Sequence, residues 1–180
     1  MDAPSEAVGD QNSALASGDQ LQPTTSTGNV PAAKRLQQEL MALVTNGPKG
    51  ISAFPDGDSL FRWIATIRGP EATVFEGTDY RLSLEFSGLY PFQPPKVRFQ
   101  TPCFHPNVGP NGDICIDILQ DKWTPLLDVR SVLLSIQSLL AEPNISSALN
   151  SEAAQLWNDK ELYKSARELF EAGPSEDNTS

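Results

Sequence analysis

The order of apolar and polar positions predicts a helix at the start of the folded part of the chain. Apolar residues recur at helical spacing from Leu36 to Val44, which places them on one face of a helix. Pro31 precedes them and is favourable at a first helical position. Gly47-Pro48 follows them and is expected to end the helix.

Between residues 51 and 99 the pattern changes to strict alternation. It is clearest over residues 61–68, 80–86 and 96–99. Alternation with short connections predicts consecutive antiparallel strands that bury one face. The loop at 90–95 contains three prolines, which stiffen it and prevent further strand pairing there.

Helical spacing returns after an irregular stretch at 101–127. Asp128 is a favourable N-cap for a helix with a wide apolar stripe, which we expect to be the central buried helix. Ser151 is expected to cap a short helix, and Asn158-Asp159 to begin another whose apolar face includes Leu162 and Leu169. Strands followed by helices predict an α+β fold.

The two ends of the chain differ in composition from the rest. Residues 1–30 are rich in small and polar residues and contain no Lys or Arg. Such a segment cannot bury enough apolar surface to offset its ordering entropy, so we expect a disordered N-terminal extension at 1–30 and a disordered tail at 173–180. Seven acidic residues in 1–30 and 171–180 account for most of the net charge of −10.

Composition also argues against several classes of function. The sequence has no dense basic patch, which disfavours nucleic-acid binding. Two cysteines and one histidine do not form a disulfide framework or a metal-ligand cluster, so we expect no bound metal. The chain shows no signal peptide and no long apolar run. We therefore expect no membrane association and a reducing location, in the cytoplasm and nucleus.

Cys115 carries the clearest chemistry. It follows a His-Pro-Asn turn at 105–107 and an Asn-Gly turn at 111–112, and isoleucine flanks it on both sides. A thiol between two turns with an amide side chain nearby suggests thioester chemistry. A cysteine hydrolase would need a base and an orienting group. Proline follows His105 directly, and no orienting group can be identified.

Several motifs together resemble the ubiquitin-conjugating enzyme family. They are Tyr-Pro-Phe-x-Pro-Pro at 90–95, His-Pro-Asn at 105–107, Cys115, and Trp-Thr-Pro at 123–125. The resemblance covers residues 31–170 and implies a catalytic domain at 31–172. It also implies that family's fold, with an N-terminal helix, a four-stranded antiparallel meander and three further helices.

The amino-acid sequences of four segments are similar to those of the subgroup that works with the anaphase-promoting complex. These segments are 34–40, 50–55, 101–103 and 134–140. A disordered N-terminal extension also suits that subgroup. The resemblance therefore implies a role in cell-cycle control and proteasomal degradation.

The resemblance implies the reaction and the site residues. Cys115 would accept ubiquitin from an activating enzyme as a thioester and pass it to substrate lysines. ATP would be consumed upstream, so we expect no bound cofactor. The matching His105 is structural in the family, and Asn107 stabilises the oxyanion or braces the loop. Asp117 and Ser147 match positions that line the gate for the acceptor lysine. Ala148 stands where the family commonly has proline.

Partner surfaces are implied in the same way. Lys34 and Arg35 resemble the basic face that meets the activating enzyme. Phe92, Pro125 and Leu126 resemble the apolar loop tips gripped by RING-type ligases, of which the anaphase-promoting complex is the one expected. We expect the protein to act as a monomer.

Two alternatives stay open within the family. One is a conjugating enzyme for another ubiquitin-like modifier, which the ligase-type loops argue against. The other is a non-catalytic scaffold that only binds ubiquitin. Such variants generally lack the nucleophile, whereas Cys115 and Asn107 are both present.

Overall fold

Four antiparallel strands form the centre of the structure, a computed structural model that describes residues 29–173. They are β1 (Ile51–Asp56), β2 (Ser59–Arg68), β3 (Asp79–Glu85) and β4 (Lys96–Phe99). Each strand pairs with the next one along the chain, in the order β1-β2-β3-β4. This confirms the meander expected from the alternating pattern.

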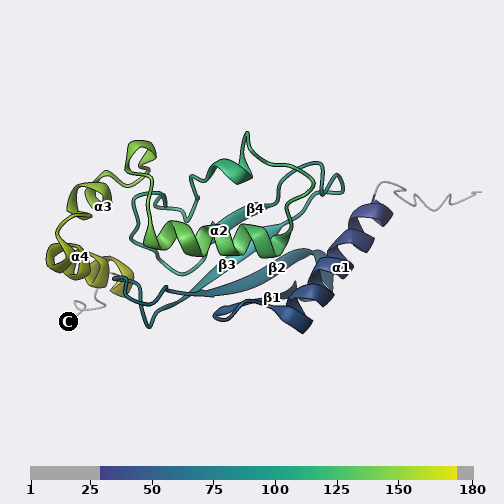
Figure 1. Ribbon diagram of the computed structural model, residues 1–180, viewed down its shortest axis with the longest axis horizontal. Helices are drawn as coiled ribbons and strands as arrows, with labels where there is room; N and C mark the ends of the chain where they lie inside the picture. The colour runs from purple at the N-terminus through teal and green to yellow at the C-terminus, as the bar shows by residue number, and fades with distance from the viewer. Residues whose placement is uncertain (1–28, 174–180) are drawn as a thin grey trace, which may run out of the picture.

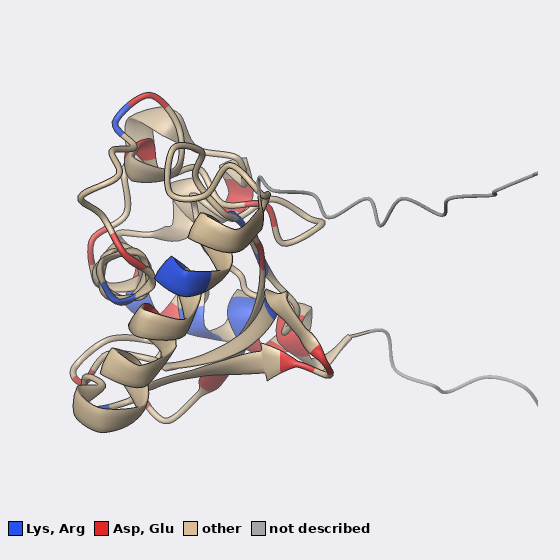
Figure 2. Cartoon of the chain, turned by 90° about the vertical axis from the view of Figure 1, so that its right-hand side faces the viewer, with Lys and Arg blue, Asp and Glu red and all other residues tan. Residues whose placement is uncertain are grey.

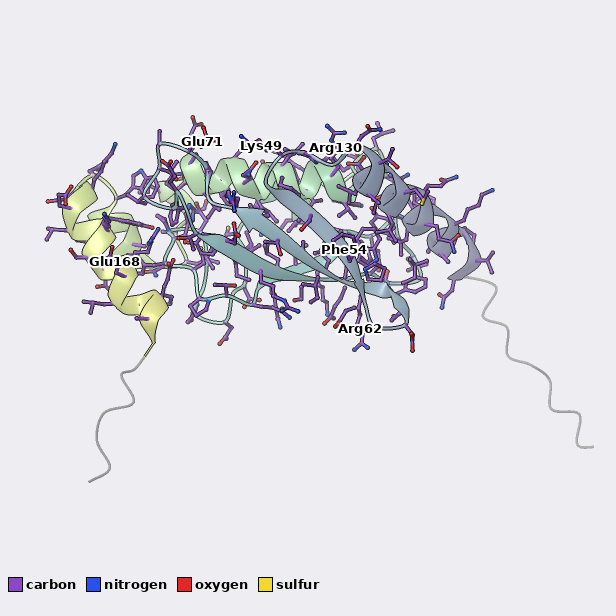
Figure 3. All side chains as sticks on the ribbon, turned by 90° about the horizontal axis from the view of Figure 1, so that it is seen from below. Lys49, Phe54, Arg62, Glu71, Arg130 and Glu168 are labelled. Atoms are coloured by element: carbon purple, nitrogen blue, oxygen red, sulfur yellow. The ribbon has the colours of Figure 1, made fainter. Side chains whose placement is uncertain are left out.

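Alternation along the strands decides which side chains enter the core. Trp63, Ala65 and Ile67 of β2 are fully buried, because successive side chains of a strand point to opposite faces. Phe54 and Arg62 lie on neighbouring strands with their side chains exposed (Figure 3). One face of the sheet therefore forms the core while the other meets solvent.

Two helices pack against the sheet, one at its end and one along it. The pattern predicted that the first helix starts at Pro31, and α1 (Asn29–Asn46) begins two residues earlier. α2 (Val129–Ala141) begins at the predicted cap, where the Asp128 side chain accepts a hydrogen bond from Ser131 N. Figure 1 shows α1 at one end of the sheet and α2 along it. The buried residues of α2 are Val129, Val132, Leu133, Ile136 and Leu140.

The remaining helices lie at the opposite end of the sheet from α1 (Figure 1). They are α3 (Ser151–Leu156) and α4 (Lys160–Ala172). The predicted cap Ser151 is wrong, because the Asn150 side chain accepts the capping hydrogen bond from Ala153 N. Leu162 and Leu169, which were predicted on the apolar face of α4, are 56% and 78% exposed. Spacing alone identified the helix, but only packing against the sheet decides which part of its apolar face is covered.

Two short 3-10 turns complete the described chain, η1 (Asp117–Leu119) and η2 (Ile145–Ser147). The disordered extension expected at 1–30 and the tail expected at 173–180 lie outside the described part, except for Asn29 and Val30, which belong to α1, and Gly173, the C-cap of α4. No helix between residues 29 and 173 is long and apolar enough to cross a membrane. The same residues contain no group of three or more His, Cys, Asp or Glu side chains placed to hold a metal ion.

Candidate active site

Cys115 lies on one arm of a short hairpin. Its backbone N–H donates to Asn107 O at 2.9 Å, and Val108 bridges to Ile114 on the opposite arm. The Cys115 side chain is partly exposed. The hairpin therefore places the backbone of Cys115 opposite that of Asn107 and leaves the thiol partly exposed.

The tip of this hairpin is fixed to the edge of the sheet. Phe99 N of β4 donates to Gly112 O at 2.9 Å. Gly112 has a φ of +81°, and a Cβ added there would lie 2.0 Å from Phe99 O. Only glycine fits this close approach and this backbone conformation, so Gly112 determines where the arm that carries Cys115 begins.

Asn107 is fully buried and all of its side-chain polar atoms are engaged. Its Nδ2 donates to Asn144 O at 2.7 Å and to Ser147 O at 3.1 Å. Its Oδ1 accepts from Asn144 N at 2.8 Å. These three bonds join the hairpin to residues 144–148, which we call the gate loop. In this structure the amide makes the contacts of a loop brace.

His105 is fully buried beside Asn107. Its Nδ1 accepts from Asn107 N at 3.0 Å, so its Nε2 carries the proton and donates to Leu139 O at 2.8 Å. Burial lowers the pKa of His105 from 6.5 to about 4. Both ring nitrogens are occupied, so the imidazole offers no free base to Cys115.

The gate loop is organised around a residue that the sequence reasoning missed. Asn144 O accepts from Ser147 N at 3.2 Å, and Asn144 Oδ1 accepts from Ser146 Oγ at 2.6 Å. Ser147 is exposed and contributes its carbonyl to Asn107. The signal was available, because an asparagine after a helix-ending proline and before two serines is typical of a side-chain-stabilised turn.

Asp117 begins η1, two residues after Cys115. Its Oδ2 forms an ion pair with Lys122 Nζ at 2.7 Å, and both side chains are at least half exposed. The hydrogen bond from Lys122 holds the pKa of Asp117 below its usual range. The carboxylate therefore stays ionised at the surface.

Cys103 is in a different environment from Cys115. It is 4% exposed, and burial raises the pKa of its thiol well above the ordinary value. A buried thiol of this kind acts as a small apolar side chain. Cys115 is the more accessible of the two thiols.

The side chains expected to meet a ligase stand out in solvent. Phe92 is 77% exposed and Leu126 is 92% exposed. Pro125, which directly precedes Leu126, is exposed as well. We call Phe92, Pro125 and Leu126 the apolar tips. Trp123 Nε1 donates to Pro91 O at 2.8 Å, which ties the two loops together.

The two residues expected to meet the activating enzyme differ from each other. Lys34 is exposed, whereas Arg35 binds the protein's own chain. Its Nε contacts Glu39 Oε1 at 2.5 Å, and its Nη2 donates to Pro125 O and Leu127 O at 3.1 and 3.0 Å. In the view of Figure 2, basic and acidic segments are interspersed.

Glu39 is the second residue that the sequence reasoning missed. It is 7% exposed, and its carboxylate accepts from Arg35, from Tyr90 OH at 2.8 Å and from Val129 N at 2.8 Å. Burial and the adjacent Glu39 raise the pKa of Tyr90, so the phenol stays protonated and donates. The spacing of Arg35 and Glu39, four residues apart on a helix, was the available signal.

Comparison with known proteins agrees with this geometry. The family model described as "Ubiquitin-conjugating enzyme" matches residues 35–170. A relative from Schizosaccharomyces pombe (strain 972 / ATCC 24843), "Ubiquitin-conjugating enzyme E2-20 kDa", is 51% identical over 126 residues. The match covers 69% of this chain and 72% of the relative. The family expected from the sequence motifs is confirmed: the chain belongs to the ubiquitin-conjugating enzymes, which transfer ubiquitin through a cysteine thioester and work with an activating enzyme and ligases.

Proposed function

We propose that Cys115 is the residue that carries ubiquitin, and that the acyl group passes from it to substrate lysines with a RING-type ligase bound. One observation carries this assignment. Cys115 is a partly exposed thiol on a hairpin arm opposite the buried Asn107, whereas Cys103 is enclosed in the core.

The transfer consists of two acyl exchanges. The Cys115 thiolate attacks the thioester carbonyl on the activating enzyme, whose own thiolate leaves. The amine of a substrate lysine then attacks the new thioester, an amide bond forms, and the Cys115 thiolate leaves as the amine loses a proton. The buried His105 does not activate water beside Cys115, which suits a carrier whose thioester has to survive until the amine arrives.

Asn107 acts in this proposal by bracing the gate loop. Its three hydrogen bonds fix residues 144–147 to the hairpin arm opposite Cys115. The incoming lysine has an ordinary pKa of ~10.4 and has to lose its proton before it attacks. Asp117 and Ser147 supply polar groups that orient the amine, and the Asp117 carboxylate, whose pKa is lowered by Lys122, stays charged and attracts the amine without acting as its base.

The partner surfaces complete the proposal. The apolar tips are the ligase contact, because exposed aromatic and aliphatic side chains on stiff loops serve as interface anchors. Lys34 contributes to the activating-enzyme face. Sequence similarity to the subgroup supports the anaphase-promoting complex as the ligase. It is found in segments 34–40, 50–55, 101–103 and 134–140. Action in cell-cycle control and proteasomal degradation follows. The enzyme would act as a monomer in cytoplasm and nucleus, with ATP consumed upstream and no bound cofactor.

A charging reaction tests the assignment of Cys115. The full chain is incubated with activating enzyme, ATP and ubiquitin and analysed on a gel with and without reductant. The wild type should form an adduct that reductant cleaves. Cys115→Ser should form one that resists reductant but yields to base, and should not transfer ubiquitin.

Cys103→Ser is the matched control and should charge like the wild type. A wild-type adduct that survives in Cys115→Ala, or disappears in Cys103→Ser, would place the thioester on the other cysteine. Charging with another modifier but not with ubiquitin would instead favour the alternative modifier.

A further inference from the structure

Arg35 makes contacts that a residue kept only for its charge does not need. Its Nη2 donates to Pro125 O and to Leu127 O, the carbonyls on either side of Leu126. Its Nε is held by Glu39, and its side chain is 30% exposed. One guanidinium therefore grips the backbone immediately before and after the most exposed of the apolar tips.

Burial does not hold the side chain of Leu126 in its position. It is 92% exposed, and an apolar side chain in that position gains nothing from burial. Its backbone is restrained locally only by Thr124, whose Oγ1 accepts from Leu126 N at 3.3 Å and whose carbonyl accepts from Leu127 N at 3.0 Å. An external restraint is needed to stop the loop from folding its apolar residue back onto the protein surface.

The loop that carries Phe92 is anchored to the same carboxylate, that of Glu39. Tyr90, two residues before Phe92, donates its hydroxyl to both oxygens of Glu39 at 2.8 and 2.9 Å. Val129 N at the start of α2 donates to Glu39 as well. Figure 1 shows α1 beside the end of the sheet that these loops approach. Glu39 thus connects the loops of Phe92 and Leu126 through one buried point on α1.

We propose that Arg35, oriented by Glu39, is a positioning residue for ligase-dependent transfer: it clamps the backbone around Leu126 so that the two loops that carry the apolar tips meet a ligase in a fixed arrangement. This rests on the proposed ligase role of the tips. It also assigns Arg35 a different task from Lys34, although the two are adjacent and both were expected on the activating-enzyme face. A planar guanidinium donates to several acceptors in a fixed geometry, whereas a lysine ammonium at the same position cannot reproduce that fork.

The first measurement needs no ligase. Amide hydrogen exchange at Leu126 and Leu127 is followed by NMR in the wild type, Arg35→Ala, Arg35→Lys and Lys34→Ala. Loss of two charge-assisted hydrogen bonds should speed exchange about tenfold or more in both Arg35 variants. Lys34→Ala removes the same charge from the adjacent residue and should leave exchange unchanged. Equal exchange in Arg35→Ala and Lys34→Ala would overturn the clamp.

The second measurement uses the same variants in transfer. The RING module of the anaphase-promoting complex is titrated into single-turnover discharge, with loading and ligase-free discharge to free lysine measured alongside. We expect the KM for the RING module to rise about tenfold in both Arg35 variants, with kcat, loading and ligase-free discharge unchanged. Phe92→Ala serves as a positive control for loss of ligase contact.

The outcomes separate this inference from the function on which it rests. A loading defect shared by Arg35→Ala and Lys34→Ala but absent from Arg35→Lys would show that Arg35 acts through its charge, and would overturn the positioning role. Faster exchange with an unchanged KM would overturn it too. A wild type that no RING module stimulates would contradict the proposed ligase role, while exchange that rises only in the Arg35 variants would still establish the clamp.

Discussion

The gate loop beside Cys115 and the loops that end in the apolar tips are both irregular, and each is fixed by one buried side chain on a regular or tightly bonded part of the chain. At the gate loop the anchor is the neutral amide of Asn107. At the apolar tips it is the carboxylate of Glu39, paired with Arg35. A neutral amide donates and accepts at the same time, whereas a carboxylate only accepts.

The two anchors also differ in how many parts of the protein a substitution would affect. Asn107 serves one loop, residues 144–147. Glu39 is contacted from α1, from Tyr90 before the first tip and from the start of α2. A buried charge that loses a partner costs more than a neutral group that loses one. Damage at Glu39 should therefore affect the stability of the fold, and damage at Asn107 should affect mainly the reaction.

Glu39→Gln should produce the larger loss of stability. The amide retains one acceptor oxygen for three donors and removes the charge that pairs with Arg35, whose side chain is 30% exposed. Leaving a buried donor without its acceptor costs about 1 to 3 kcal/mol for each donor. The free energy of unfolding from urea denaturation measures this loss.

A matched exposed pair sharpens the test. Arg98 and Asp113 lie 2.7 Å apart with both side chains more than half exposed. Asp113→Asn should therefore lower the free energy of unfolding by less than about 1 kcal/mol. Equal losses in the two variants would contradict the view that Glu39 is a buried structural charge.

The strands and the central helix were predictable because each follows from local pattern. Alternation around Trp63 predicted β2, and Asp128 marked the start of α2. The two anchors could not be assigned in the same way, because their partners lie far away in the sequence. Asn107 contacts Asn144 at a separation of 37 residues, and Glu39 contacts Val129 at a separation of 90. No local spacing encodes a contact of that kind.

The free energy of unfolding should depend on pH through His105. The neighbouring anchor, the amide of Asn107, carries no charge and does not titrate. Burial lowers the pKa of His105 from 6.5 to about 4, so the unfolded chain binds a proton at a higher pH than the folded one. The stabilisation is complete above pH 6.5 and is lost as the pH falls toward 4. Over that range it amounts to about 3 kcal/mol.

Urea denaturation at a series of pH values measures this dependence, with His105→Asn as the control. The slope of unfolding free energy against pH between 6.5 and 4 should be steeper in the wild type than in the variant. Parallel slopes would mean that His105 titrates normally in the folded protein, which its burial between Asn107 N and Leu139 O does not allow.

Asn107→Ala should have a smaller effect on stability and a selective effect on transfer. Without its three hydrogen bonds the gate loop moves away from the thiol, and misplacement by about 1 Å can cost on the order of 100-fold in rate. Single-turnover discharge of the ubiquitin thioester to free lysine should slow by that factor. Loading should stay near the wild-type rate, because the gate loop orients the lysine and not the activating enzyme.

Asn144→Ala distinguishes a brace from an oxyanion donor at Asn107. It leaves the Asn107 side chain in place but removes the side chain that holds Ser146 within the gate loop. If Asn107 acts by bracing, Asn144→Ala should slow discharge in the same direction, and the double variant should be little slower than Asn107→Ala alone. If Asn107 acts on the oxyanion, loading and discharge should slow together in Asn107→Ala, because both exchanges pass through a tetrahedral oxyanion. Asn144→Ala would then discharge normally.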